Sequence, residues 1–191
     1  MRERYQIRGR FVLFAGNVKP HKNLERLIRA FARVRCQEGN EDLRLVLIGD
    51  DVSRYASLRR TAEEVGVRQD VRFFGFVPHE TLAALYRMAT VFAFPSLYEG
   101  FGLPPLEAMA SGTPVVTSNT SSLPEVTGGA AVLVDPYDVG SIVDGVRRVL
   151  TDPSLAAELR RKGPLRAREF SWARSVAQTR QLYELIAGRH A

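Results

Sequence analysis

Two carboxylates and a glycine-rich turn lie in one short segment of the chain, residues 99–107. Glu99 and Glu107 have seven residues between them. That interval begins with Gly100, Phe101, Gly102 and Leu103. Pro104 favours the first turn of a helix, so we expect Glu99 before a helix and Glu107 on it. Carboxylates accept hydrogen bonds from hydroxyl groups, and free N–H groups at a helix start bind phosphate. The segment therefore fits a ligand that carries both hydroxyls and phosphate.

A second segment, residues 16–23, combines a glycine and two lysines at an expected helix start. Gly16 lets the backbone approach a ligand closely, and Lys19 and Lys22 bring positive charge. Lysines gain nothing from the dipole at a helix N-terminus, which favours a binding role over a solvated turn. A charge-assisted hydrogen bond contributes about 1.5–3 kcal/mol, so this loop suits a diphosphate. The segment has neither the Walker A pattern nor the Gly-x-Gly-x-x-Gly pattern of dinucleotide loops.

Other interpretations of the titratable residues are weaker. A glycosidase uses two carboxylates as acid and base, but a hydrolase has no need of phosphate-binding loops. Glu107 taken alone matches an ordinary exposed helix carboxylate. We interpret Asp50 and Asp51 as a turn at a strand end and His21 as a loop residue. We therefore expect no metal site and no metal cofactor.

The spacing of apolar residues predicts alternating strands and helices. Strands are expected at residues 11–15, 45–48, 71–74, 91–94, 114–117 and 131–134. Most are unbroken apolar runs, which are typical of parallel strands covered on both faces. We therefore predict an α/β fold, a Rossmann-like doubly wound parallel sheet of about six strands with helices on both faces. Both candidate segments follow strands, and ligands of such folds bind beyond the carboxyl ends of the strands.

The end of the chain predicts C-terminal helices beyond the sheet. Asp152 and Pro153 begin a helix that we expect Gly163 and Pro164 to interrupt or bend. Ser171 can cap a final helix.

Composition limits the class of protein. The 191 residues are 45% hydrophobic and 25% charged, as in globular domains that bury a sizeable core. Cys36 is the only cysteine, and no secretory signal is visible, so we expect a cytoplasmic protein.

The net charge of +6 arises largely late in the chain, as at Arg160 and Arg161. We interpret these residues as a solvated surface, with peripheral contact with an anionic membrane at its inner face as the alternative. No nucleic-acid motif accompanies them, so no nucleic-acid partner is expected.

Motifs spread over residues 11–186 resemble a known family. The most specific is the pair Glu99 and Glu107 around Gly-Phe-Gly, followed by Ala-Met-Ala-Ser-Gly-x-Pro-Val at residues 108–116. The loop at residues 16–23 and the Phe-Pro-Ser of residues 94–96 add to it. The chain resembles the C-terminal, nucleotide-sugar-binding domain of retaining group 1 glycosyltransferases, which have the two-domain GT-B architecture.

The resemblance implies roles for individual residues. Lys22 and Glu99 would be catalytic: Lys22 would pair with the diphosphate, and Glu99 would contact the hydroxyls of the donor sugar. Glu107 would hold the ribose hydroxyls, and Val77 would read the base through its backbone. Further contacts with the nucleotide sugar are implied for Gly16, Asn17, Lys19, Gly100, Phe101, Gly102, Leu103 and Leu106.

One position departs from the family pattern. Many members carry an arginine where this chain has Asn17, and there it makes a second phosphate contact. Lys19 is the candidate replacement. A loop of this type is similar to that of mannosyl- and rhamnosyltransferases of polysaccharide biosynthesis, which points to GDP-mannose.

The resemblance also implies a division of the chain. Residues 1–10 would be a truncated interdomain connection, residues 11–170 the nucleotide-sugar-binding domain, and residues 171–191 a helix that returns to an absent N-terminal acceptor domain.

The implied function is the donor-binding half of an enzyme that transfers a hexose, with retention, from a GDP-mannose-like or UDP-sugar donor to a glycan or lipid-linked acceptor. We expect this half to be inactive alone. A non-catalytic nucleotide-sugar-binding module and another GT-B enzyme, such as a nucleotide-sugar epimerase or a phosphorylase, stay open as alternatives.

Overall fold

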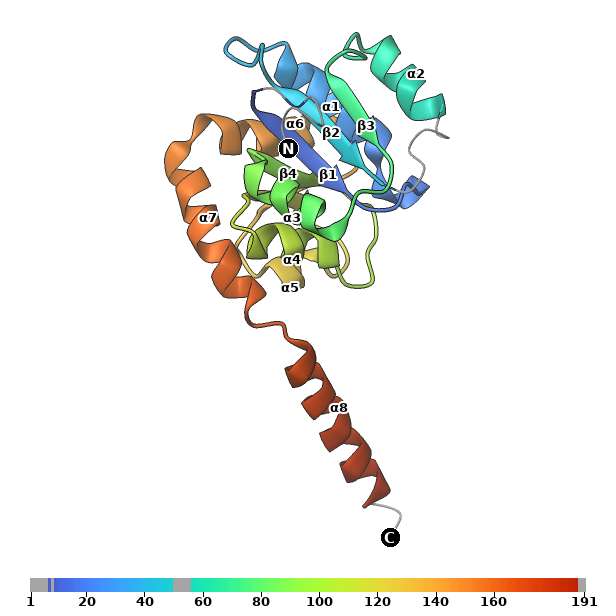
Figure 1. Cartoon of the computed structure of the whole chain (residues 1–191), viewed down its shortest axis with the longest axis vertical. Helices are drawn as coiled ribbons and strands as arrows, with labels where there is room; N and C mark the ends of the chain where they lie inside the picture. Colours follow the sequence, from blue (N-terminus) through green and yellow to red (C-terminus); the bar gives the residue numbers. More distant parts are fainter. Residues whose placement is uncertain (1–6, 8, 50–55, 189–191) are drawn as a thin grey trace.

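Strands and helices alternate along the chain and build one parallel sheet covered on both faces (Figure 1). The computed structural model describes residues 7, 9–49 and 56–188. The six strands are β1 (Phe11–Ala15), β2 (Arg44–Ile48), β3 (Val71–Phe74), β4 (Val91–Phe94), β5 (Val115–Ser118) and β6 (Val132–Val134). The helices are η1 (Pro20–Lys22, a 3-10 turn), α1 (Leu24–Arg35), α2 (Ala56–Glu64), α3 (His79–Met88), α4 (Leu103–Ala110), α5 (Leu123–Thr127), α6 (Val139–Thr151), α7 (Pro153–Ala167) and α8 (Trp172–Ala187).

The predicted fold class is confirmed, because the sheet is parallel and its central strands are buried on both faces. Every residue of β1, β4 and β5 is buried, and β2 is buried apart from its first residue. Phe14, Phe92 and Phe94 stack in the middle of the sheet, with ring centroids 5.5 and 5.8 Å apart. The expected strand at 114–117 begins one residue later, and the short helix α5 had not been predicted.

The order of the strands creates a point where the chain changes direction across the sheet. The order is β3-β2-β1-β4-β5-β6, and all neighbouring pairs are parallel. The chain moves outward from β1 to β3 and then returns through α3 to place β4 beside β1 on its other side. The connections after β1 and β4 therefore leave on opposite faces, which opens a crevice between their carboxyl ends.

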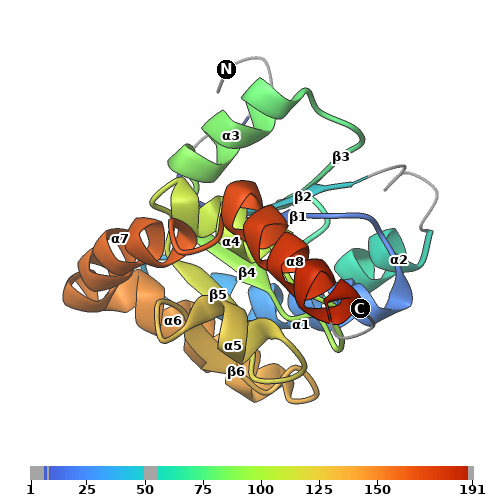
Figure 2. The same cartoon turned by 90° about the horizontal axis from the view of Figure 1, so that it is seen from below.

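The helices form two layers. Helices α1, α2 and α6 pack side by side on one face, and α3, α4 and α5 cover the other. Helix α7 contacts both α6 and α4, so it passes round the sheet from one layer to the other (Figure 2).

Gly163 and Pro164 were expected to interrupt or bend this helix; the interruption is wrong, because α7 is continuous from Pro153 to Ala167. Gly163 is buried against α4, and a Cβ atom at this position would lie 3.2 Å from the carbonyl oxygen of Met109. The glycine therefore allows two helices to approach closely. Pro164 lacks an N–H group, and the packing of α7 on α4 and α6 outweighs that lost helical bond.

Helix α8 projects away from the rest of the molecule (Figure 1). The predicted cap is confirmed, since the Ser171 hydroxyl accepts a hydrogen bond from the N–H of Arg174 at 3.2 Å. None of the helix's residues is buried, and Trp172 is 82% exposed. Its apolar side chains, such as Trp172 and Tyr183, are thus exposed. No helix in the described ranges is both long enough and apolar enough to cross a membrane.

The close packing of α6 on the sheet leads to a test of the fold. A Cβ atom at Gly145 would lie 3.0 Å from Cγ1 of Val116 and closer still to Cγ1 of Val134. Overpacking of this kind costs about 1–3 kcal/mol, so Gly145→Ala should lower the free energy of unfolding by that amount. Urea denaturation measures it. Arg148→Ala, an exposed change on the same helix, should stay within about 0.5 kcal/mol of the unaltered chain. Equal effects of the two changes would contradict this packing.

Candidate functional site

The candidate site lies where the loops after β1 and β4 meet, at the switch point of the sheet. Residues 16–23 join β1 to α1, and residues 95–102 join β4 to α4. The N–H of Leu97 donates to the carbonyl of His21 at 2.7 Å, so the two loops are bonded to each other. The two sequence segments singled out for chemistry are thus neighbours in space, although they are far apart in the chain.

Asn23 fixes the first loop. Its backbone has φ of 61°, in the left-handed region that asparagine tolerates better than most residues. Its buried side-chain amide donates to the carbonyls of Pro95, at 2.9 Å, and Pro136, at 2.7 Å. Arg26 in turn donates to the Asn23 side-chain oxygen at 2.9 Å. One side chain therefore joins the loops that follow β1, β4 and β6.

Lys22 and Glu99 form a buried ion pair at the centre of this crevice. The Lys22 Nζ atom lies 2.5 Å from Glu99 Oε1, and the side chains are only 8% and 12% exposed. The ammonium also lies over the Phe94 ring, 4.9 Å from its centroid. The Ser96 hydroxyl donates to the same carboxylate oxygen at 2.6 Å. Both donors bind Oε1, so Glu99 Oε2 has no partner within the described ranges.

A run of hydroxyl side chains after β5 holds the loop that carries Glu99. The N–H of Glu99 donates to the hydroxyl of Ser121 at 3.1 Å. The hydroxyl of Ser122 lies 2.9 Å from the Glu99 carbonyl and 2.7 Å from that of Phe101, and Ser118 donates to the Ser96 carbonyl at 2.6 Å. These serines were not among the site residues predicted from the sequence. The polar run at residues 118–122, directly after an apolar strand, was the available signal.

The start of α4 presents free backbone donors. Gly102 caps the helix with φ of 112°, and a Cβ atom there would lie 2.9 Å from Leu123. Pro104 and Pro105 remove two of the N–H groups that a helix start usually offers. The N–H groups of Phe101, Gly102 and Leu103 find no acceptor among the residues that the structure describes. These three donors are the ones assigned to the donor phosphate and sugar from the sequence.

Glu107 lies one turn further along α4 and is exposed. Its Oε2 atom accepts a hydrogen bond from the Tyr86 hydroxyl at 3.0 Å. Leu106 beside it is 7% exposed and packs into the core. Glu107 and Leu103 also line an apolar cavity of about 520 Å³ with Phe101, Phe170 and Trp172. Glu107 therefore lies at the edge between a polar crevice and an apolar hollow.

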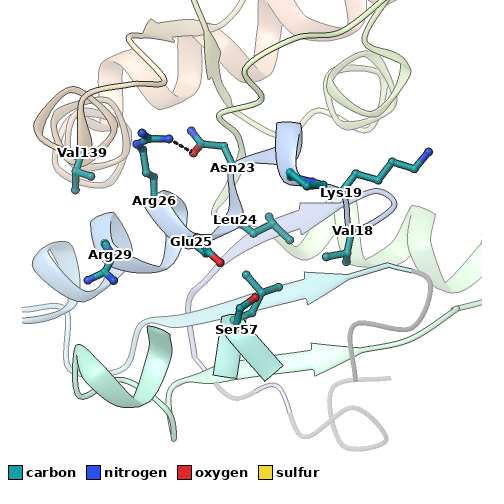
Figure 3. A pocket seen from close by; sticks show the side chains of 11 residues that line it. Val18, Lys19, Asn23, Leu24, Glu25, Arg26, Arg29, Ser57 and Val139 are labelled. Carbon is teal, nitrogen blue, oxygen red and sulfur yellow. Dashed lines mark hydrogen bonds between the residues drawn. The ribbon is translucent and has the colours of Figure 1, made fainter. Parts of the chain in front are cut away.

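Two residues of the predicted nucleotide-sugar site have side chains that lie apart from the ion pair. Asn17 and Lys19 are exposed, and in the part of the chain that the structure covers neither side chain bonds to Lys22 or Glu99. The Lys19 carbonyl accepts a backbone hydrogen bond from the N–H of Lys22 at 2.9 Å. Lys19 instead lines a cavity of about 460 Å³ at the start of α1, together with Arg26 and Arg29. Figure 3 shows its side chain extending away from these two arginines.

The remaining predicted residues lie at the same edge of the sheet. Gly16 follows β1 directly, and Gly100 is exposed in the loop before α4. Val77 is buried between β3 and α3, whereas Phe76 next to it is 88% exposed. Asp50 and Asp51 lie outside the described residues. No group of three or more His, Cys, Asp or Glu side chains suited to a metal ion occurs in the described ranges.

The chain is similar to known proteins over most of its length. Residues 2–166 match the family described as glycosyl transferases group 1. The O-antigen chain mannosyltransferase B of Escherichia coli is 38% identical in an alignment of 190 positions that covers 96% of this chain and 48% of that protein. The chain therefore spans about half the length of this relative.

Solved structures share the fold. Sucrose-phosphate synthase from Thermosynechococcus elongatus superposes with a TM-score of 0.83 at 32% identity, over 98% of this chain and 48% of that one. The C-terminal domain of a glycosyl transferase group 1 family protein from Francisella tularensis has a TM-score of 0.76 at 24% identity, over 87% and 89% of the two chains. Since the family match covers most of the sequence, the chain belongs to the group 1 glycosyltransferases, and it has the fold of one half of a GT-B enzyme.

Proposed function

We propose that this chain is the donor-binding half of a retaining hexosyltransferase whose donor is a nucleotide diphosphate sugar. The observation that carries the proposal is the buried Lys22–Glu99 pair at the switch point, beside three free backbone N–H groups. A cation, amide donors and a carboxylate at one point match a ligand with phosphate and hydroxyl groups side by side. The relative from E. coli is a mannosyltransferase, which favours GDP-mannose over a UDP-sugar as the donor.

Lys22 neutralises the diphosphate without leaving Glu99. An ammonium group has three N–H donors, and Glu99 Oε1 uses one of them. The others are available to phosphate oxygens, together with the N–H groups of Gly102 and Leu103. When the bond to the sugar breaks, negative charge grows on the nucleoside diphosphate. A fixed cation and fixed dipoles stabilise that charge, which is the part of catalysis that this half supplies.

The two carboxylates bind hydroxyls on either side of the diphosphate. Glu99 keeps Oε1 on Lys22 and Ser96 and presents Oε2 to the transferred sugar. Glu107 keeps Oε2 on Tyr86 and presents Oε1 to the ribose diol. The base then lies toward the turn at Val77, with Leu106 packed near the ribose. Lys19 is the proposed outer phosphate contact, reached through its long exposed side chain.

The acceptor site belongs to a separate N-terminal domain in this proposal. The chain spans about half of the O-antigen mannosyltransferase from E. coli, and the unburied helix α8 is the element that would return to the other half. The acceptor would be a glycan or lipid-linked glycan of polysaccharide biosynthesis. The enzyme would act in the cytoplasm, with the exposed Arg160 and Arg161 of α7 able to contact the anionic inner face of the membrane.

The diphosphate contact is tested with variants of the ion pair. Lys22→Met alone leaves the buried Glu99 charge unpaired, which costs stability, so the double variant Lys22→Met/Glu99→Gln is measured beside it. Both should bind GDP roughly 10- to 100-fold more weakly by calorimetry, the value of one charge-assisted hydrogen bond. Lys162→Met, which removes a lysine from α7, is the matched control and should bind normally.

Unchanged GDP affinity in the folded double variant would remove Lys22 from the site. If the unaltered chain showed no saturable binding of GDP, UDP or their sugars, the proposed function itself would be wrong.

The sugar contact is tested by comparing two ligands on one variant. Glu99→Gln replaces the carboxylate by an amide of the same shape, which accepts hydroxyl protons more weakly than a charge does. It should lose roughly tenfold in affinity for GDP-mannose relative to its own affinity for GDP, since a hydrogen bond to a charged group contributes about 1.5–3 kcal/mol. The ratio of the two dissociation constants is the measurement. An unchanged ratio would mean that Glu99 does not contact the sugar.

A further inference from the structure

Tyr86 is a buried tyrosine whose hydroxyl bonds to Glu107, the carboxylate proposed to bind the ribose. In the described part of the chain, the hydroxyl has no other hydrogen-bond partner. Tyr86 is 3% exposed and comes from the last turn of α3, whereas Glu107 lies on the next helix, α4. The hydroxyl donates to Glu107 Oε2 over 3.0 Å. Tyr86 belongs to neither of the two loops that carry Lys22 and Glu99. It was not among the site residues predicted from the sequence.

The ring of Tyr86 has little freedom to move. It packs edge-on against Phe92 in the core, with centroids 5.3 Å apart and an interplanar angle of 69°. Its backbone carbonyl accepts a bond from the Thr113 hydroxyl at 2.6 Å, which fixes the end of α3 to the segment before β5. The hydroxyl is therefore held at one place relative to the sheet.

The chemistry of the pair sets the direction of the hydrogen bond. Burial raises the pKa of the Tyr86 hydroxyl above its ordinary value, and the negative charge of Glu107 raises it further. The phenol keeps its proton, so it is the donor and the carboxylate is the acceptor. Glu107 Oε1 has no partner in the described ranges and stays available to a ligand.

Glu107 needs such a contact because nothing else there restrains it. The side chain is exposed, and no lysine or arginine pairs with it among the described residues. A glutamate has several rotatable bonds, and a ligand that binds it must immobilise them, which weakens binding. A carboxylate already held by a rigid neighbour avoids most of that loss.

We propose that Tyr86 is a positioning residue, which holds the Glu107 carboxylate in the orientation that accepts the two hydroxyls of the donor ribose. The inference rests on the proposed function, since it assumes that Glu107 binds the nucleotide. It assigns the orientation of the ribose contact to a residue in the core beneath the crevice. Tyr86 itself does not touch the ligand.

The test uses two nucleotides that differ only in the ribose hydroxyls, GDP and 2′,3′-dideoxy-GDP. Tyr86→Phe removes the hydroxyl and keeps the ring against Phe92, so the melting temperature serves as a check of folding. The variant should bind GDP roughly 3- to 10-fold more weakly, as expected for one hydrogen bond acting through its partner, and bind the dideoxy nucleotide as the unaltered chain does. Tyr183→Phe, an exposed tyrosine on α8, is the control and should alter neither affinity.

The outcomes separate the inference from the function on which it rests. Equal weakening of both nucleotides by Tyr86→Phe would make Tyr86 a merely structural residue and overturn the inference. If Glu107→Gln selectively weakens GDP but Tyr86→Phe does not, the ribose role of Glu107 stands and the inference fails. If Glu107→Gln affects neither nucleotide, the proposed ribose contact is wrong as well.

A double-mutant cycle gives a second measurement that does not depend on one variant. In a Glu107→Gln background, Tyr86→Phe should cause no further loss of GDP affinity, because the carboxylate that it positions is already gone. Additive losses would overturn the inference.

Discussion

The ion pair between Lys22 and Glu99 is the interaction on which the site depends. It joins the loop after β1 to the loop after β4, so it exists only because the chain places these two strands side by side. A buried pair is stable only when both partners stay in place, because removal of one leaves an uncompensated charge. The loops must therefore be rigid. Asn23 supplies part of that rigidity, and the hydroxyls of Ser121 and Ser122 supply the rest.

A common arrangement follows for the two carboxylates of the site. Each has one oxygen bonded to the protein, Glu99 through Lys22 and Ser96 and Glu107 through Tyr86, and one oxygen without a described partner. A carboxylate held in this way offers a fixed acceptor to a hydroxyl, and the ligand need not order the side chain first. The same arrangement explains why a glycine-rich loop, which is intrinsically flexible, can still present its donors in a defined direction. Its neighbours hold it at the carboxylate and at the carbonyls.

The sequence predicted what depends on local pattern and missed what depends on distant contacts. Unbroken apolar runs identified the parallel sheet, and Ser171 identified the start of α8. Both features depend on residues that are close together in the sequence. Gly163 was expected to interrupt or bend α7. The glycine instead allows α4 to pack closely against α7, and no local sequence pattern reveals that contact. Lys22 and Glu99 were each singled out, but their pairing spans 77 positions and requires the strand order. Tyr86 was passed over because a buried tyrosine in an apolar helix looks like an ordinary core residue.

The loop that carries Glu99 is also connected to α8, a helix with no buried residue. Phe101, between the two carboxylates, packs edge-on against Phe170 with centroids 5.7 Å apart. Phe170 lies two residues before α8, and the Arg166 guanidinium covers its ring while donating to the carbonyls of Val126 and Glu125. A partner that covers the exposed apolar side chains of α8 would therefore lie close to Phe101, in the loop proposed to bind the donor phosphate. In the proposed enzyme, an acceptor half that packs on α8 would lie beside the Phe101–Phe170 contact, at the edge of the rigid loop that carries Glu99.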